Sequence, residues 1–433
     1  MKRIVLAIAL ALGVAGVNAA DLAQVYEMAA RNDPALQAAR AGRDATFEAV
    51  PIAKSQLLPN ISLSGDASYN HQDVNRSSLG SFEDDFESGN AALQLIQPLY
   101  RKDLSIALDQ AEDQVKQAKV DYTAAQQDLI VRVTQAYFAV LSAQDTLTFT
   151  DADLKAIERQ LDQAKQRFEV GLIAITDVNE AQARYDQARA DKIVANNDLD
   201  NAVQALVEIT GEPTGALARL KPGLKLQPPQ PASIDEWTAT AASNNPNVVS
   251  AEYDADIAKK EIERQDAGDS PAIDLVGSYG IARSNADSAT DANTGSIGVQ
   301  LSLPFYTGGG VQSATRQARF RHEAAQQVLE QQRRAAETQV RNGFRGVNAS
   351  ISRVRALEAA EVSARSALEA TEAGFEVGTR TLVDVLNSQR DLFRSRRDLA
   401  LSRYDYVLNM LSLRQAAGTL SVSDIEQATL WLK

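Results

Sequence analysis

The chain has 433 residues, no cysteine and a formal net charge of −13 at pH 7. The lack of cysteine excludes disulfides, zinc-thiolate sites and a lipid on an N-terminal cysteine, and the acidic charge argues against nucleic acid and anionic membrane surfaces as partners. The two histidines, His71 and His322, are too few and too scattered for most histidine-based catalysis or metal binding, so we expect no cofactor and no metal site.

A secretory signal peptide is predicted at residues 1–19. A basic start, an apolar run from Ile4 to Val17 and the small residues that follow predict cleavage after Ala19 or Ala20. The alternative is a membrane-spanning helix, which is disfavoured because the apolar run is too short to cross a bilayer. No later segment has about 18 unbroken apolar residues, so we expect no helix to cross the membrane.

Residues 20–212 form a predicted first structural repeat, which begins with short helices. A strand pair is predicted at 60–70 and 89–98, where apolar and polar residues alternate with the period of two that gives a strand one apolar face. Such strands have the length of a transmembrane β-strand, about 9–11 residues. The residues between them, 70–89, are expected to form a long external loop. Pro51 falls inside a predicted helix and should kink or end it.

The first repeat ends with a predicted helical hairpin at 103–209. No proline lies between Pro98 and Pro213, and small and apolar residues recur in alternating steps of three and four, the seam of a coiled coil. The first helix, from about 103 to 168, would be roughly 100 Å long at about 1.5 Å per residue. The return helix runs from about 176 to 209.

The second repeat, residues 234–433, has the same order of elements and follows a proline-rich linker at 213–233 in the equatorial region. The motif Asn-x-Pro opens equivalent helices in both halves, at 32–34 and 244–246. Further along, the second repeat is predicted to contain a strand pair at 272–282 and 296–304, linked by an external loop at 283–295, then a helical hairpin at 311–416 with helices 311–374 and 381–416, and a C-terminal equatorial segment.

One motif occurs twice and marks the duplication. Residues 168–178 and 375–385 share Phe-Glu-Val-Gly and a later Asp-Val, and each copy lies in the middle of a long proline-free stretch. Each copy is therefore expected to be the turn of a hairpin, with a glycine, Gly171 or Gly378, at positive φ. Asp177 and Asp384 would then lie at helix N-termini, where a carboxylate is favoured by about 0.3–1 kcal/mol.

The strand count predicts an oligomer. Four strands cannot close a barrel, and an open sheet edge in lipid leaves backbone groups unsatisfied. A dimer would supply eight strands around a filled interior, and a trimer twelve, which can leave a channel. The expected fold class is an α+β membrane protein. Its four β-strands contribute to a trimeric 12-stranded β-barrel, and its two long coiled-coil helical hairpins contribute to a 12-helix α-barrel.

A family resemblance rests on several features of the sequence. These are the paired Asn-x-Pro openings, the strand pairs, the stretches 196–203 and 302–309 and, above all, the two tips. The sequence resembles the TolC family of outer-membrane channel proteins, also called outer membrane efflux proteins, over essentially all of residues 20–433. The resemblance implies a homotrimer with a β-barrel in the outer-membrane lipid and a helical tunnel through the periplasm. It also implies docking to a periplasmic adaptor and to an inner-membrane transporter of the RND or ABC type.

The function implied by this resemblance is a passive exit duct for drugs or proteins in tripartite efflux or type I secretion, with an iris-like periplasmic gate. The mature chain would lie in the outer membrane and extend into the periplasm. Some relatives are lipoproteins, and the absence of cysteine places this chain among the unlipidated ones.

The resemblance also assigns roles at the tips. Arg380 would bond Thr176 and Asp177 between tips and hold the mouth shut, and Asp384 would face the lumen in a ring of three carboxylates that selects cations. The alternative for Arg380 is a solvated arginine worth about 0–1 kcal/mol.

Two gate positions depart from the family pattern. Phe375 replaces a tyrosine and lacks its hydroxyl, and Asn387 replaces a second aspartate, which weakens the ring. The tip residues implied to contact the adaptor are Val170, Gly171, Leu172, Val377, Gly378 and Thr379.

Two other classes of protein are disfavoured. An enzyme with a phosphate loop is excluded because Gly-Lys-Ser/Thr does not follow the triple glycine at 308–310, and the acidic residues of the helices lie among Lys, Arg and Gln as solvated faces. A periplasmic adaptor is the alternative function, since adaptors also carry long helical hairpins. Adaptors have one hairpin and a soluble β-rich end, whereas this chain has two hairpins and membrane-like strands.

Overall fold

The structure is a computed structural model that describes residues 19–76, 80–221, 223, 225–286 and 291–432. The predicted signal peptide, apart from Ala19, lies outside these residues. The chain divides into two compact units. Unit 1 comprises Met1–Ala39, Thr123–Asn245 and Ala335–Lys433, and unit 2 comprises Arg40–Tyr122 and Pro246–Arg334. Each unit therefore draws on both halves of the sequence.

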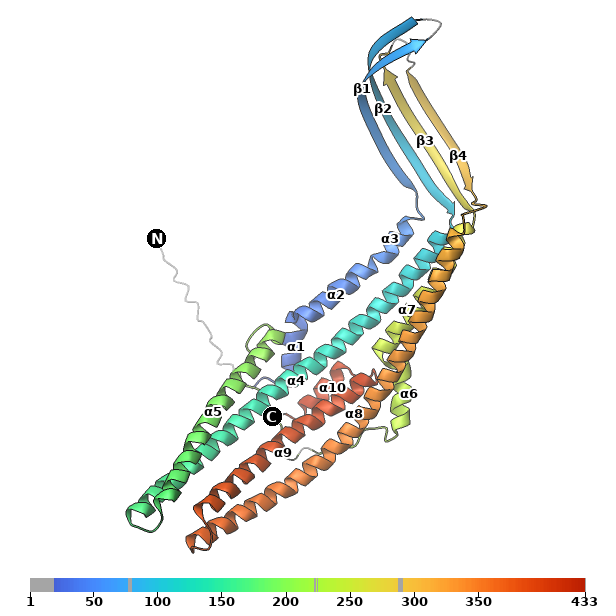
Figure 1. Cartoon of the computed structure of the whole chain (residues 1–433). Coiled ribbons are helices and arrows are strands. Elements are labelled where there is room, and N and C mark those ends of the chain that lie inside the picture. Colours follow the sequence, from blue (N-terminus) through green and yellow to red (C-terminus); the bar gives the residue numbers. More distant parts are fainter. Residues whose placement is uncertain (1–18, 77–79, 222, 224, 287–290, 433) are drawn as a thin grey trace, which may run out of the picture. The chain divides into compact units, whose positions relative to one another are not determined.

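Unit 2 contains a four-stranded antiparallel sheet with the order β1-β2-β3-β4. The strands, visible in Figure 1, are β1 (Asn60–Arg76), β2 (Gly80–Tyr100), β3 (Ala272–Ser284) and β4 (Ala292–Ser302). All four predicted strands are present, and the two predicted pairs are β1–β2 and β3–β4; β2 also pairs with β3.

The predicted strand boundaries were partly wrong. The segments 70–89 and 283–295 are not simply loops, because β1 pairs with β2 as far as Arg76↔Gly80 and β3 pairs with β4 as far as Ala282↔Ala292. Backbone pairing continues there although the side chains are polar, so side-chain composition misled the prediction. Strand β4 ends at Ser302 rather than at residue 304, since Pro304 has no N–H to donate to a ladder.

The sheet has one apolar and one polar face. Residues that are directly opposite in the ladders share a face, and Leu63, Leu93 and Tyr279 follow one another across three strands. The apolar face is open in a single chain, since Leu63 is 77% and Ile297 76% exposed. The other face carries polar pairs, among them Ser62↔Gln94, Gln94↔Ser278 and Ser278↔Ser296.

The helices of unit 2 show the expected effect of Pro51. Helix α2 (Pro34–Phe47) stops, Glu48 forms a turn, and α3 (Ala49–Ser55) begins anew. A proline ring clashes with the carbonyl four residues earlier, here that of Phe47, so the helix breaks at the position that Pro51 predicts.

The second half of the sequence contributes helix α7 (Pro246–Asp266) to unit 2, and the 3₁₀ turn Ala267–Asp269 follows it. Arg101 forms a bidentate ion pair with Asp274 of β3, at 3.1 and 3.0 Å.

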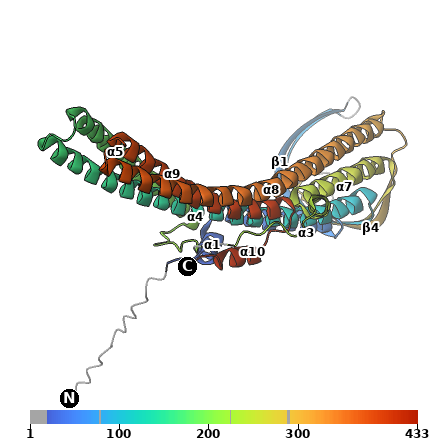
Figure 2. The same cartoon turned by 90° about the horizontal axis from the view of Figure 1, so that it is seen from below.

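Two long hairpins make up most of unit 1, and the first helix of each begins in unit 2. The first consists of α4 (Lys102–Glu169) and α5 (Ile175–Thr210), and the second of α8 (Gly310–Glu376) and α9 (Leu382–Ala416). These bounds agree closely with the predicted helices, because the heptad seam is buried or half-buried along α4 as far as Ala164. Figures 1 and 2 show the two hairpins side by side, with their tips at the same end of the unit.

Unit 1 also contains three short helices, α1 (Leu22–Asn32), α6 (Ile234–Asn244) and α10 (Val422–Thr429). The two Asn-x-Pro turns each hold the end of a return helix. The Asn32 amide donates to the Thr210 carbonyl at 2.7 Å, and the Asn245 amide donates to the Ala416 carbonyl at 2.8 Å. Within the described residues no helix is long and apolar enough to span a membrane.

Candidate functional site at the hairpin tips

Both copies of the repeated motif form the same helix end. Gly171 and Gly378 have φ of +76° and +77°, as predicted. In the first copy the Gly171 and Leu172 N–H groups donate to the carbonyls of Phe168 and Arg167, at 2.9 and 2.8 Å. The second copy makes the equivalent bonds, so each turn is a Schellman motif. The shared Phe-Glu-Val-Gly residues therefore encode one turn.

The two return helices start differently. Thr381 caps α9: its hydroxyl oxygen accepts from the Asp384 N–H at 3.2 Å, while the Asp384 carboxylate accepts from the Thr381 N–H and hydroxyl, both at 2.9 Å. These bonds lower the pKa of Asp384, with a smaller contribution from the charge of Arg380. In α5 the N-cap is Ala174, which has no hydroxyl, and only the Asp177 carboxylate bonds back, to the Ala174 N–H at 3.3 Å.

The tips of the two hairpins are joined by an apolar cluster. It combines residues of α4, α5 and α9, and Phe375 at the end of α8 packs against it. Its buried members are Ile157, Leu161, Ala164, Ala181, Ala188, Leu382 and Leu386. The family resemblance placed Phe375 at the gate without the hydroxyl of the family's tyrosine, and in the structure its ring packs against this cluster.

Two polar contacts also connect the hairpins near the tips. The Arg167 guanidinium lies over the Phe375 ring, 4.6 Å from its centre, and the Arg184 side chain donates to the Asn387 amide oxygen at 3.5 Å. Sequence analysis did not find Arg167 or Arg184. Both lie on helical faces whose partners belong to the other half of the chain, and no local pattern reveals such a pairing.

The remaining predicted residues lie at the surface of the tips. Val170, Leu172 and Val377 are 70%, 73% and 75% exposed, and Gly171, Gly378 and Thr379 are exposed with them. Thr176 and Arg380 are exposed as well, and within the described part of this single chain no ion pair joins Arg380 to Asp177. The clasp and the Asp384 ring concern contacts among several tips, so both stay predictions.

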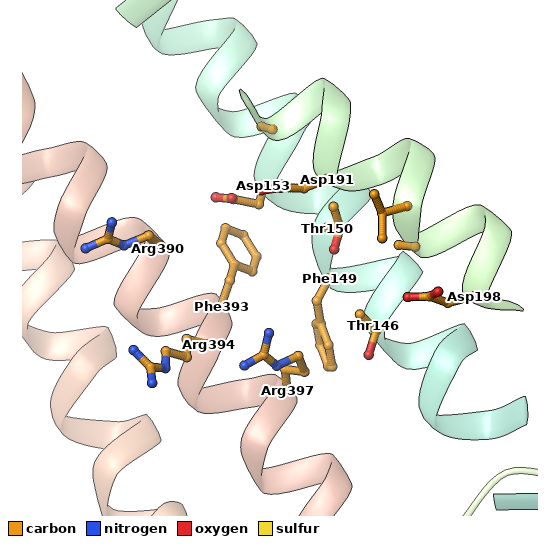
Figure 3. Close-up of a pocket in the computed structure, with 13 residues that line it drawn as sticks. Thr146, Phe149, Thr150, Asp153, Asp191, Asp198, Arg390, Phe393, Arg394 and Arg397 are labelled. Atoms are coloured by element: carbon orange, nitrogen blue, oxygen red, sulfur yellow. The ribbon is translucent and has the colours of Figure 1, made fainter. Parts of the chain in front are cut away.

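A second feature missed by the sequence analysis is a cleft between α4–α5 and α9, above the tip cluster. Figure 3 shows its lining, in which Asp153, Asp191 and Asp198 oppose Arg390, Arg394 and Arg397. Among the described residues, no group of three or more His, Asp or Glu side chains is suited to hold a metal ion.

A family model described as "Outer membrane efflux protein" matches residues 25–212 and 237–419. The chain is 43% identical to the outer membrane protein TolC of Vibrio cholerae, over 100% of this chain and 99% of that protein. It is 31% identical to the alkaline protease secretion protein AprF of Pseudomonas aeruginosa, over 93% of this chain and 85% of that protein.

The solved structures agree on the fold. The CmeC outer membrane channel of Campylobacter jejuni superposes with a TM-score of 0.81 at 17% sequence identity, covering 95% of this chain and 90% of that one. The expected fold class, with paired strands and two long helical hairpins, is therefore confirmed.

Proposed function

Because the chain belongs to the outer membrane efflux protein family, it is an outer-membrane exit duct for efflux and secretion, and we propose that it works as a homotrimer. Passive conduction requires no covalent chemistry, so the chain is not an enzyme. The alternative, a periplasmic adaptor, finds no support among these similarities, because the relatives are outer-membrane and secretion proteins.

The observation that carries the proposal is the open sheet of unit 2. Among the residues that the structure describes, its edge strands β1 and β4 each have a neighbour on one side only, and its apolar face is exposed. In lipid, every backbone group must find a partner, so the edge β4 of one copy should pair with the edge β1 of the next. Three copies would supply twelve strands around a channel.

The oligomer can be tested directly. We expect native mass spectrometry of the purified protein in detergent to give three times the mass of the mature chain. Cysteines placed on the two edges, for example Ser64→Cys on β1 and Thr294→Cys on β4, should then form intermolecular disulfides, because the chain has no other cysteine. A dimeric mass would contradict the trimer.

The partners proposed are a periplasmic adaptor and an inner-membrane RND or ABC-type transporter. The exposed apolar side chains of Val170, Leu172 and Val377 support an adaptor contact at the tips, because exposed apolar groups that lie together mark interaction sites. Photocrosslinkers at Leu172 and Val377 should capture the adaptor in cells, whereas one at the exposed Val362 of α8 should not. Drugs and proteins are the proposed cargo.

The gate proposed at the periplasmic end consists of Thr176, Asp177, Phe375, Arg380, Asp384 and Asn387. The exposed Arg380 supports it, since its guanidinium forms no ion pair within the described part of the chain and is available to the carboxylate of a neighbouring tip. Arg380→Ser should raise the single-channel conductance in a planar bilayer, because it removes the clasp. Arg355→Ser, an exposed arginine away from the tips, is the control. Equal conductance of Arg380→Ser and the unmodified channel would refute the clasp.

Cleavage of the signal peptide after Ala19 is proposed over cleavage after Ala20. The Ala20 N–H donates to the Ala216 carbonyl at 2.7 Å, and the Ala20 carbonyl accepts from the Ala218 N–H at 3.0 Å and from the Tyr137 hydroxyl at 3.2 Å. Cleavage one residue later would remove all three bonds. Mass spectrometry of the mature, unlipidated protein should therefore give an N-terminus at Ala20, and a terminus at Asp21 would contradict this.

A further inference from the structure

The cleft between the two hairpins of unit 1 lies away from the tips. Its volume is about 480 Å³, and its walls are α4 and α5 on one side and α9 on the other. Thr146, Phe149, Thr150 and Asp153 come from α4, and Arg390, Phe393, Arg394 and Arg397 from α9 (Figure 3). The hairpins are in contact at both ends of this segment. The Tyr404 hydroxyl of α9 donates to Asp145 of α4 at 2.6 Å, and the tip cluster lies at the other end.

The two walls of the cleft carry opposite charges. The wall formed by α4 and α5 carries three carboxylates, and the α9 wall carries three guanidinium groups. Equal numbers of opposite charges give the cleft no net charge that would select an ionic ligand. Opposite charges on facing walls instead attract each other. The arrangement therefore favours approach of the walls over the binding of a small molecule.

The polar groups at this interface are incompletely bonded. Within the described residues, three buried side-chain atoms lack a hydrogen-bond partner: Asp153 Oδ1 and Gln160 Oε1 on α4, and Gln389 Nε2 on α9. A buried polar atom without a partner costs about 1–3 kcal/mol. All three lie on the two helices that flank the cleft, two as acceptors on α4 and one as a donor on α9. Of the three residues, Asp153 lines the cleft itself.

Asp153 is the charged member of this set. In Figure 3 its carboxylate points toward the wall that carries Arg390. Burial and the neighbouring Asp191 of α5 raise its pKa to about 6, and the charge of Arg390 opposes this rise. On α4 itself, Asp151 is already paired with Lys155 and with Lys192 of α5, so these lysines are engaged elsewhere. Arg390 is the base that faces Asp153 from α9.

We propose that Asp153 and Arg390 form a pH-dependent latch between the two hairpins of one chain. When Asp153 is ionised, its charge draws Arg390 and the adjoining part of α9 across the cleft into an ion pair. When Asp153 is protonated, this attraction is lost and the cleft stays open. Ion pairing lowers a carboxylate pKa, so closure and proton release are linked, and the closed form is favoured as the pH rises.

The latch can be tested by distance measurement without any assay of transport. The chain contains no cysteine, so Ala190→Cys on α5 and Ser395→Cys on α9 give two unique spin-label sites across the cleft. Labelled chains are diluted into unlabelled ones in the full-length protein, so that pulsed electron resonance reports distances within one chain. We expect a shorter distance at pH 7.5 than at pH 5, with a midpoint at or below about 6.

Three variants decide the assignment. Asp153→Asn and Arg390→Gln should each keep the pH 5 distance at both pH values, because each removes one charge of the latch. Asp198→Asn removes another carboxylate of the same cleft and should keep the pH response. A distance in the unmodified protein that does not change with pH would overturn the proposal, as would a normal pH response in Asp153→Asn or Arg390→Gln.

Discussion

Arg167, which directly precedes the first copy of the repeated motif, and Phe375, which opens the second copy, connect the two tips: the Arg167 guanidinium lies 4.6 Å from the centre of the Phe375 ring. The pair joins residues from the two halves of the sequence, and the ring also packs on the apolar cluster of the tips. This contact thus connects the two turns to each other.

The coupling of Arg167 and Phe375 can be measured. Arg167→Gln should destabilise the protein, but not in a Phe375→Leu background, which keeps an apolar side chain and removes the ring. We expect a coupling of about 0.5–1 kcal/mol, the lower range for a cation–π pair, because both side chains are half-buried and keep contact with solvent, as measured by thermal unfolding followed by helical circular dichroism. Arg159→Gln, at an exposed position of α4, is the control. Equal losses in both backgrounds would show that the contact contributes nothing.

Substitutions at the two N-caps of the return helices should change the stability of the protein in opposite directions. Thr381→Ala should cost about 0.5–2 kcal/mol, because it removes the hydroxyl that accepts from the Asp384 N–H. Ala174 occupies the equivalent position with similar extended backbone angles and has no hydroxyl. Ala174→Thr should therefore stabilise the first tip. Thermal midpoints of the two variants should move in opposite directions, and a fall in both would contradict this account of the caps.

The proposed carboxylate ring predicts ion selectivity. Asp384→Asn should lower the preference for cations, and Asn387→Asp should raise it, both measured as reversal potentials across a salt gradient. The pKa of Asp384 is lowered by its bonds to Thr381. Its negative charge and its capping contribution are therefore complete above the ordinary carboxyl pKa, and they are lost only as the pH falls through the lowered pKa. Selectivity should therefore stay constant from pH 7 to pH 5. A decline within that range would assign the selectivity to another group.

Alanine substitutions at two glycines with positive φ distinguish the free-energy cost of backbone strain from the cost of a steric clash. Gly215 and Gly418 have φ of +72° and +71°, and a side chain at Gly215 would meet open space, whereas one at Gly418 would collide with the Asn244 carbonyl. Gly215→Ala should cost about 1–2 kcal/mol from the left-handed backbone alone. Gly418→Ala should cost clearly more, since it also displaces the Asn-x-Pro turn from the end of α9. Similar thermal midpoints would mean that this turn moves without cost.

Much of the fold follows from patterns in the sequence. The absence of proline and the heptad spacing predicted α4 and α8 to within two residues at each end, and Pro51 predicted the break between α2 and α3. The alternation of Leu63 with its polar neighbours predicted a strand with one apolar face. Each of these features depends on the backbone geometry of consecutive residues. The extension of β1 and β2 beyond residue 70 was missed because ladder bonds join backbone groups whatever the side chains.

The candidate site contains both features that the sequence predicted and contacts that it did not. The sequence by itself determined both tip turns, because positive φ at Gly171 and Gly378 is a local requirement of a helix end. Only the tertiary structure decided that Phe375 packs against Arg167, that Asn387 meets Arg184, and that the half-buried Asp153 lies opposite Arg390. These contacts depend on the rotation and axial shift of one hairpin against the other. That arrangement minimises the free energy of the whole interface, and no single stretch of the sequence encodes it.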